Sequence, residues 1–344
     1  MVSISIAAWQ TAAIHSAAIL RRDPPQETKT VMRKFIILLA LVTTGLVCTA
    51  EETNTVVITT APIQTALASE KTKLPWHLVN IWWVMPETAD FESIEIDVTI
   101  SEDVDPSKLN LYIAPMGLGK LNDISFYGGI QTNIGGYPVT DASPQVVAYH
   151  KGKGAIFSRW GNKDLDTSFV RPAVNGLTEA AGYEGDFASG RRPFLWKAGT
   201  YTYAVRKMMY EKDRDGKEST WVGAFLTEKS SNQTIFIAAL KFPGRTLKFW
   251  GQHASFIEIY GGKKVVIADL PKLEVRFGMP RVNGQSVATR QLSVSYPKDG
   301  STASPAIMTS ELSADGKEVI CKLHQEILTR EKWSFPLLQA TQIK

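Results

Sequence analysis

The sequence predicts an all-β protein, an antiparallel β-sandwich of the jelly-roll or lectin-like kind with a possible small β extension at its C-terminal end. Three observations predict this fold class. Apolar and polar residues alternate over many short segments, no window of twelve or more residues beyond the leader has helical periodicity, and turn residues recur at a spacing typical of sandwiches. The composition, 44% hydrophobic and 21% charged over 344 residues, is that of an ordinary globular chain.

Residues 32–50 have the layout of a secretory signal peptide. Arg33 and Lys34 supply positive charge, residues 35–47 form an apolar run, and small residues lead to Ala50. A membrane anchor is the weaker interpretation, because thirteen helical residues are too short for a hydrocarbon core about 30 Å thick. We expect cleavage after Ala50, a secreted or periplasmic location, and no stable membrane span afterwards.

The stretch before this leader is interpreted as an over-extended start. Residues 1–31 precede a better start at Met32 and have no role in such a signal, so we leave them out of the fold. Cys321 is the one cysteine beyond the leader, so no internal disulfide is expected. A disulfide-free exported chain suits a bacterial protein.

The charge balance argues against nucleic acid as a partner. Residues 51–344 hold 33 basic and 32 acidic side chains, so this part of the chain is nearly neutral. Binding to a phosphate backbone needs a broad basic field, which such a balance does not supply.

Strands are expected from the period-two pattern, taken here in chain order. Residues 51–75 are a linker or a first short strand, and residues 76–262 form the main sandwich. Residues 94–100 alternate strictly, and residues 201–226 form a hairpin around a charged turn at 213–217. Further strands are expected at 155–160, 234–242, 255–259, 265–268, 272–277, 291–296 and 318–324.

A change of composition near Gly261 and Gly262 marks a boundary. Beyond it the strands are plainer and the loops are richer in Gly, Pro and Ser. Residues 263–344 are therefore a β-rich C-terminal extension, formed either as a small appendage or as extra strands of the same sandwich.

The sequence pattern does not indicate a metal site or a cofactor site. No two of the four histidines beyond the leader lie within five residues of each other, and no zinc motif occurs. The acidic segment from Glu211 to Gly216 resembles the start of a calcium loop, but Val222 stands where a bidentate glutamate belongs. A hairpin turn is the better interpretation, and we expect no metal and no cofactor.

A catalytic nucleophile is also not evident. There is no G-x-S-x-G elbow, and Ser158 lies in a predicted strand. Carboxylates could act in pairs, as in glycosidases, but the sequence does not give their separation. The acids available for such a pair are Asp123, Glu184, Asp186 and Glu258.

Aromatic residues give the clearest functional signal, with eight tryptophans beyond the leader. An aromatic face stacks on the C–H face of a sugar while amide or guanidinium groups bond its hydroxyls. Two segments, 127–133 and 159–164, combine such residues, and the Gly128–Gly129 pair is either a bulge or a close approach to ligand. The predicted stacking residues are Tyr127, Trp160 and Trp196, with Gln131, Asn133 and Arg159 as hydrogen-bonding partners.

The same segments resemble the bacterial family catalogued as domain of unknown function 3472, over residues 76–262. The likeness is carried, in chain order, by Tyr127–Gln131, Phe157–Trp160, Trp196–Thr200, Tyr201–Arg206, Trp221–Phe225 and Ser255–Glu258. The resemblance implies a secreted, lectin-like β-sandwich associated with carbohydrate-related exported proteins, and it supplies no catalytic residue.

Glycan binding by aromatic stacking is therefore the first functional hypothesis, with a polysaccharide as partner. A glycoside hydrolase or polysaccharide lyase on the same scaffold, using a carboxylate such as Glu184 or Glu258, is the alternative. A non-catalytic protein of envelope interactions is the third hypothesis.

Overall fold

The computed structural model describes residues 68–74, 77–135, 137–138, 152–161, 169–181, 186–261, 264–297, 306–330 and 332–338. All of them belong to one unit, Thr59–Lys344. The predicted signal peptide at 32–50, its cleavage site and the stretch 1–31 lie outside the described residues. Within the described part, no helix has the length and apolar character needed to span a membrane.

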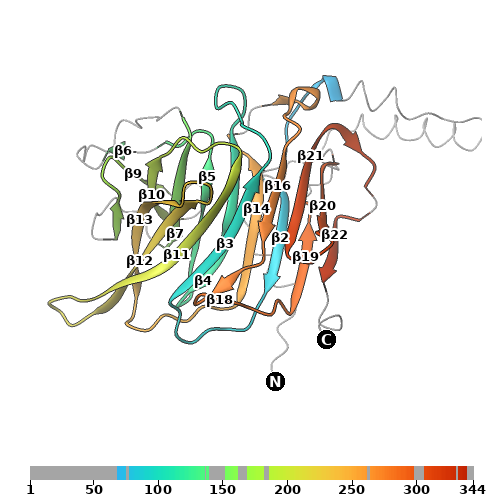
Figure 1. Cartoon of the computed structure of the whole chain (residues 1–344). Coiled ribbons are helices and arrows are strands. Elements are labelled where there is room, and N and C mark those ends of the chain that lie inside the picture. Colours follow the sequence, from blue (N-terminus) through green and yellow to red (C-terminus); the bar gives the residue numbers. More distant parts are fainter. Residues whose placement is uncertain are drawn as a thin grey trace, which may run out of the picture. The chain divides into compact units, whose positions relative to one another are not determined.

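Two large antiparallel sheets make up the fold, which confirms the predicted all-β sandwich (Figure 1). We call them the first and the second sheet. The first runs in the order β22 (Ser334–Leu338), β19 (Gln291–Ser295), β2 (His77–Val84), β14 (Gln252–Ile259), β4 (Leu111–Leu121), β5 (Ile124–Gln131), β7 (Gly154–Trp160), β10 (Phe187–Pro193), β9 (Leu177–Ala181), β6 (Tyr137–Pro138).

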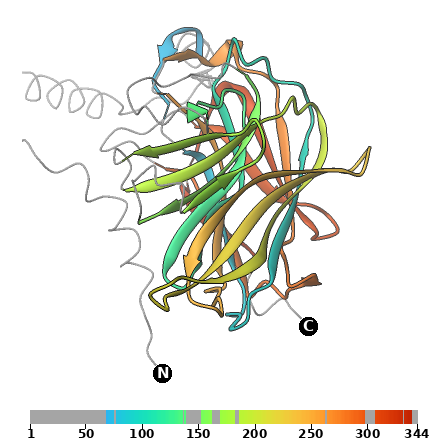
Figure 2. The same cartoon turned by 90° about the vertical axis from the view of Figure 1, so that its left-hand side faces the viewer.

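The second sheet faces the first across the main core. Figure 2 looks at the end where β7, β9 and β10 and the yellow strands β11 to β13 form separate layers. The strand order of the second sheet is β20 (Ala306–Leu312), β21 (Glu318–Leu328), β16 (Glu274–Gly278), β3 (Ser93–Ile100), β11 (Gly199–Lys212), β12 (Glu218–Glu228), β13 (Gln233–Pro243), β8 (Val170–Pro172). In addition, β17 (Arg281–Val282) lies beside β3 and β18 (Gln285–Ser286) lies beside β17.

Strand β3 shows how the sequence pattern builds this core. Ile94, Ile96, Val98 and Ile100 are at most 1% exposed, while the polar residues between them are half-buried. Successive side chains of a strand point to opposite faces, so the alternation places every apolar residue of β3 between the sheets. The predicted strand at 94–100 is confirmed.

The predicted hairpin is also confirmed, since β11 pairs with β12 along its length. In the turn, the amide of Asp213 donates to the carbonyl of Lys217 at 3.0 Å, and Gly216 has a φ of +82°. A positive φ is easy for glycine and costly for most other residues, so the Asp-Gly pair defines the turn. Among the described residues, no group of three or more potential metal ligands occurs.

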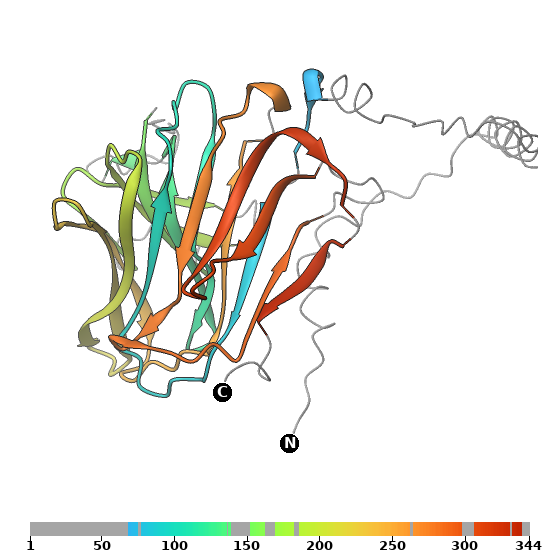
Figure 3. The same ribbon diagram turned by 45° about the vertical axis from the view of Figure 1, so that its right-hand side comes forward.

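The described strands from β16 onward are parts of the two large sheets rather than a separate appendage. β16 pairs with β3 and carries β21 and β20 with it, while β19 pairs with β2 and carries β22. Figure 3 brings these orange and red strands forward. The predicted strand at 265–268 was only partly right: Val265–Val266 form β15, which pairs with β1 (Lys71–Thr72), and a 3-10 turn, Ile267–Asp269, follows.

Candidate functional site

A second, smaller apolar cluster lies on the face of the first sheet that points away from the second sheet, which we call the outer face. It is separate from the main core. Period-two alternation requires this, because the neighbours of its members along each strand point into the core. The cluster consists of Tyr112 and Ala114 (β4), Tyr127 (β5), Ile134, Ile156 (β7), Leu177 (β9) and Phe256 (β14), with Trp160 and Tyr260 packed against it.

Aromatic rings form a row across the outer face. His77 stacks on Phe256 with centroids 4.0 Å apart, Phe256 meets Tyr112 edge-on at 5.1 Å, and Tyr112 meets Tyr127 at 6.5 Å. Tyr127 then contacts Trp160 at 4.6 Å. These rings come from β2, β14, β4, β5 and β7, which are neighbours in the sheet, so the row crosses five adjacent strands. We call these five residues the aromatic row.

Burial differs along the aromatic row. Tyr112, Tyr127 and Phe256 are 3%, 8% and 6% exposed, whereas Trp160 is half-buried. Burial lowers the pKa of His77 to about 4, against the hydrogen bond that His77 Nδ1 donates to Asn80 Oδ1, so its imidazole is neutral at pH 7. His77 and Trp160, the two ends of the row, are both half-buried, so a ring remains partly open at each end of the row.

A buried ion pair lies beside the row. Arg191 (β10) pairs with Glu179 (β9), donates to the carbonyl of Gly135 at 2.6 Å, and donates from Nε to Ser189 Oγ at 3.3 Å. Ser158 Oγ in turn donates to Ser189 Oγ at 2.8 Å. Burial lowers the pKa of the Arg191 guanidinium. All three nitrogens of this guanidinium have partners within the protein, so Arg191 holds the face together.

Two tyrosine hydroxyls on this face are in contrasting states. The hydroxyl of Tyr260 donates to the carbonyl of Asn133 and accepts from its amide, and burial raises the pKa of Tyr260 to about 12. The hydroxyl of Tyr112 is buried and has no hydrogen-bond partner among the described residues. Burial, and then the neighbouring Tyr127, raise the pKa of Tyr112 well above its ordinary value.

Of the predicted stacking residues, the structure brings Tyr127 and Trp160 together but not Trp196. Trp196 is fully buried, its Nε1 donates to the carbonyl of Gln131 at 3.0 Å, and the Lys153 ammonium lies 4.2 Å from its ring centroid. No ring face of Trp196 is open to a sugar, so its predicted stacking role is wrong. Gln131 makes this contact with Trp196 through its backbone carbonyl and not through its side-chain amide.

The predicted hydrogen-bonding partners Arg159 and Asn133 are also used inside the protein. Arg159 precedes Trp160 on β7 and so points to the opposite face, where its guanidinium donates to the carbonyl of Lys241. Burial lowers its pKa to about 10. Asn133 Nδ2 donates to the carbonyl of Pro106 at 2.6 Å and to Asn110 Oδ1 at 2.8 Å, which leaves no amide hydrogen for a ligand.

The Gly128–Gly129 pair serves packing between strands and sheets. A Cβ at Gly128 would lie 2.1 Å from the hydroxyl of Tyr203, and one at Gly129 would lie 2.2 Å from the carbonyl of Ile113. The register of β4 against β5 shifts on both sides of Met116, the residue paired with Gly128. These facts favour the bulge over a close approach to ligand.

The candidate catalytic residues differ in their exposure to solvent. Ser158 is buried, while Asp123 and Asp186 are exposed. Glu258 is half-buried on the outer face, opposite Tyr112 in the β14–β4 register. Glu184 lies outside the described residues.

Sequence reasoning missed several members of this face. Phe256 belongs to a segment singled out for the family resemblance, so its aromatic character was a usable signal. Tyr112 gave little signal, because Pro115 and two glycines interrupt the alternation on β4. The remaining missed residues are His77, Tyr260, Glu179 and Arg191.

Comparison with known proteins adds little. No protein-family model matches the sequence, and no curated protein is significantly similar to it. The resemblance to domain of unknown function 3472 thus stays a prediction.

Solved structures give a weak likeness only. Two crystal structures of scytalido-glutamic peptidase with transition-state analogues have TM-scores of 0.36 and 0.35 at 11% and 12% identity, and SCP-B, an Eqolisin-family peptidase in complex with a tripeptide, has 0.31 at 10%. Each match covers 73% of this chain and 99% of the other. At such scores nothing about activity transfers to this chain.

Proposed function

We propose that the chain is an exported glycan-binding protein whose ligand stacks on the aromatic row at Trp160. The observation that carries the proposal is the contact between Trp160 and Tyr127, two rings 4.6 Å apart on one sheet face with the indole partly open. The expected signal peptide places this face outside the cytoplasm, where polysaccharide is available.

The chemistry of the face supports a sugar rather than a purely apolar ligand. An indole offers a flat, electron-rich surface to the C–H bonds of a pyranose. The same face holds the hydroxyl groups of Ser158, Ser189, Tyr112 and Tyr260 and the charged groups of Arg191 and Glu179, and all of these except the Tyr112 hydroxyl bond within the protein. A face that combines rings with fixed polar groups suits a ligand that is apolar on one side and hydroxylated at its edge.

Affinity gel electrophoresis tests this proposal. The protein is run through gels that contain a β-glucan, a xylan, a mannan, polygalacturonate or alginate, and retardation by at least one polymer is expected. Trp160→Ala should weaken the affinity for that polymer by about tenfold or more, because the stacking surface is lost.

Trp250→Ala is the matched control. Trp250 is 36% exposed but lies outside the outer-face cluster, with the ammonium groups of Lys120 and Lys248 over its ring. Its replacement should leave retardation unchanged. Equal retardation of both variants and the parent protein would remove the aromatic row from the proposal, and no retardation by any polymer would refute glycan binding.

A further inference from the structure

Two adjacent methionines on β11 lie open to solvent. Met208 is 50% exposed and Met209 is 49% exposed. The other methionines that the structure describes are buried or half-buried, namely Met85, Met116, Met279 and Met308. Methionine commonly fills irregular gaps inside a core, so the exposed pair differs from the rest in what can reach its sulfur atoms.

A β-bulge accounts for the exposure of two successive side chains. β11 pairs with β3 only as far as Arg206, and its register against β12 then shifts between Lys207 and Met209. Met208 is the extra residue of this bulge, and Met209 stands opposite Trp221. Strict alternation would send one of two neighbouring residues toward the opposite face of the sheet, and the extra residue interrupts that alternation.

The sulfur of Met208 is packed on one side although the residue is exposed. A Cβ at Gly223 would lie 2.3 Å from Met208 Sδ and 3.1 Å from the ring of Phe225, so the thioether fills space that the glycine leaves beside that ring. Phe225 also contacts Phe236, with ring centroids 5.4 Å apart, and the Arg206 guanidinium lies 5.6 Å from its centroid. Met208 therefore joins the packing of β11 against β12 while its other side meets water.

Peroxides react with accessible thioethers. The sulfur attacks one peroxide oxygen, the O–O bond breaks and an S–O bond forms; with hydrogen peroxide the second oxygen leaves as water. The sulfur loses two electrons and the peroxide gains them. The product, methionine sulfoxide, is polar where the thioether was apolar, so it packs less well in an apolar contact such as that of Met208 with Gly223 and Phe225.

We propose that Met208 and Met209 form a modification site at which peroxides oxidise the protein, and that the sulfoxide of Met208 weakens the packing of the β11–β12 hairpin. The modification is reversible, because methionine sulfoxide reductases return the sulfoxide to the thioether. The inference does not depend on glycan binding, since the pair lies on the second sheet and the aromatic row on the first.

Peptide mapping tests the modification site. The protein is treated with hydrogen peroxide and digested, and mass spectrometry follows the oxygen gained by each methionine with time. Met208 and Met209 should react about tenfold faster or more than Met85, Met116 and Met308, because a buried sulfur reacts only when the structure opens. In concentrated urea all five should react at similar rates. Equal rates in the folded protein would overturn the site.

Two Met→Leu variants test the effect on the hairpin, because leucine keeps the volume and removes the sulfur. Peroxide should lower the urea midpoint of the parent protein and of Met209→Leu, the matched control that retains the Met208 thioether. It should change the midpoint of Met208→Leu little, and a sulfoxide reductase should restore the midpoint of the oxidised parent. An equal fall in Met208→Leu, or no fall in the parent, would overturn the role of Met208.

Discussion

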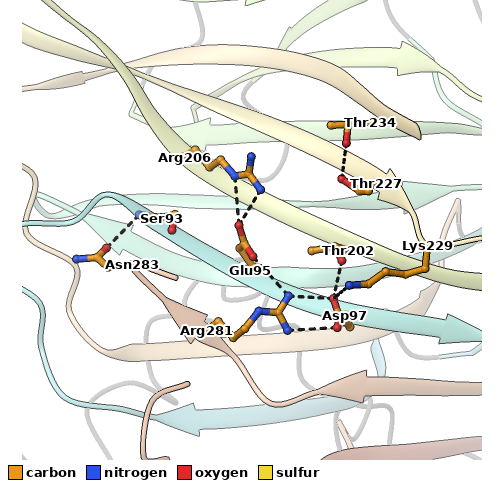
Figure 4. Close-up of polar contacts among 10 residues, drawn as sticks. All are labelled: Ser93, Glu95, Asp97, Thr202, Arg206, Thr227, Lys229, Thr234, Arg281 and Asn283. Atoms are coloured by element: carbon orange, nitrogen blue, oxygen red, sulfur yellow. Dashed lines mark hydrogen bonds and ion pairs between the residues drawn. The ribbon is translucent and has the colours of Figure 1, made fainter. Parts of the chain in front are cut away.

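The two sheets of this protein present opposite kinds of outer face. The first sheet carries the aromatic row, whereas the second carries a network of charged and hydroxyl side chains (Figure 4). In that network Asp97 accepts hydrogen bonds from Thr202 at 2.6 Å and from Arg281 at 3.1 Å. Glu95 accepts from Arg206 at 2.8 Å and from Arg281 at 3.4 Å.

The same period-two rule produces both faces. On β3 the residues between the core positions are Ser93, Glu95, Asp97 and Thr99, which suit water. On β4 and β5 the corresponding residues include Tyr112, Ala114 and Tyr127, which do not. A strand whose two sides are both apolar has to be covered on both, and Tyr112, Tyr127 and Phe256 are accordingly only 3%, 8% and 6% exposed.

The ion pairs on the two outer faces also differ in how far they are exposed to solvent. Burial raises the pKa of Asp97, but hydrogen bonds from Arg281 and Thr202 outweigh it, so the pKa lies below its ordinary value. The groups concerned are partly open to solvent, with the Arg281 side chain 28% and the Asp97 side chain 27% exposed. In the Arg191–Glu179 pair the corresponding fractions are 10% and 17%. The molecule therefore contains both a partly exposed ion pair, Arg281–Asp97, and a more buried one, Arg191–Glu179, which can be compared directly.

The largest expected effect comes from breaking the buried Arg191–Glu179 pair. Glu179→Gln leaves the buried Arg191 guanidinium without its counter-charge, and loss of one partner of a buried pair costs about 3–5 kcal/mol. The free energy of unfolding, measured in urea, should fall by that amount and should recover little at high salt. A loss below about 1 kcal/mol would show that the Arg191–Glu179 pair contributes no more to the free energy of unfolding than an exposed ion pair does.

A second expected effect concerns acid. His253 is 1% exposed, and burial lowers its pKa to about 4, with Nε2 donating to the carbonyl of Pro115 and Nδ1 without a partner among the described residues. The unfolded chain takes up a proton near pH 6.5 and the folded chain only near pH 4, so stability is full above pH 6.5. The part of the stability that depends on His253 should decline by roughly 3 kcal/mol as the pH falls from 6.5 to 4, and His77, whose pKa is also lowered to about 4, should add a loss of its own.

Urea denaturation over this pH range, repeated on His253→Gln, measures the contribution of this histidine. The variant cannot bind the proton in the unfolded state, so the stability difference between it and the parent should shrink as the pH falls. A constant difference from pH 7 to pH 4 would contradict the assignment to His253.

The smallest expected effect comes from the partly exposed network around Glu95 and Asp97 on the second sheet. Arg281→Ala removes one of three cations around Glu95 and Asp97, and Arg206 and Lys229 remain. Exposed ion pairs contribute about 1 kcal/mol or less and are screened by salt. Urea denaturation should show a loss of that size that shrinks in 1 M NaCl, and a salt-independent loss above 3 kcal/mol would erase the contrast between the faces.

Much of the fold could be predicted because its strands carry local signals. The strict alternation of β3 and the Asp-Gly turn between β11 and β12 are visible within a few residues each. β4 was missed because both of its faces are buried and Pro115 and glycines interrupt it, so neither alternation nor strand-forming residues mark it. β10 was missed for a similar reason, since its small and charged residues have no strand-like composition.

The candidate site was only partly predictable. Tyr127 and Trp160 were chosen from their own segments, and strand pairing brings them together. Trp196 has the same local appearance, but the chain folds it between the sheets, and no local pattern reports that. Tyr112 and Phe256 reach the row from separate strands, so their role depends on a sheet order that composition does not give.

The placement of β2 and β3 has a consequence for how the chain matures. Each is an early segment held between two later ones: β2 between β14 and β19, and β3 between β11 and β16. β3 cannot acquire its second neighbour until the polypeptide extends past Gly278, and β2 cannot until it extends past Ser295. One edge of each of these two strands therefore stays unpaired until the last fifth of the chain is available to fold, which leaves a site for wrong strand pairing during that interval.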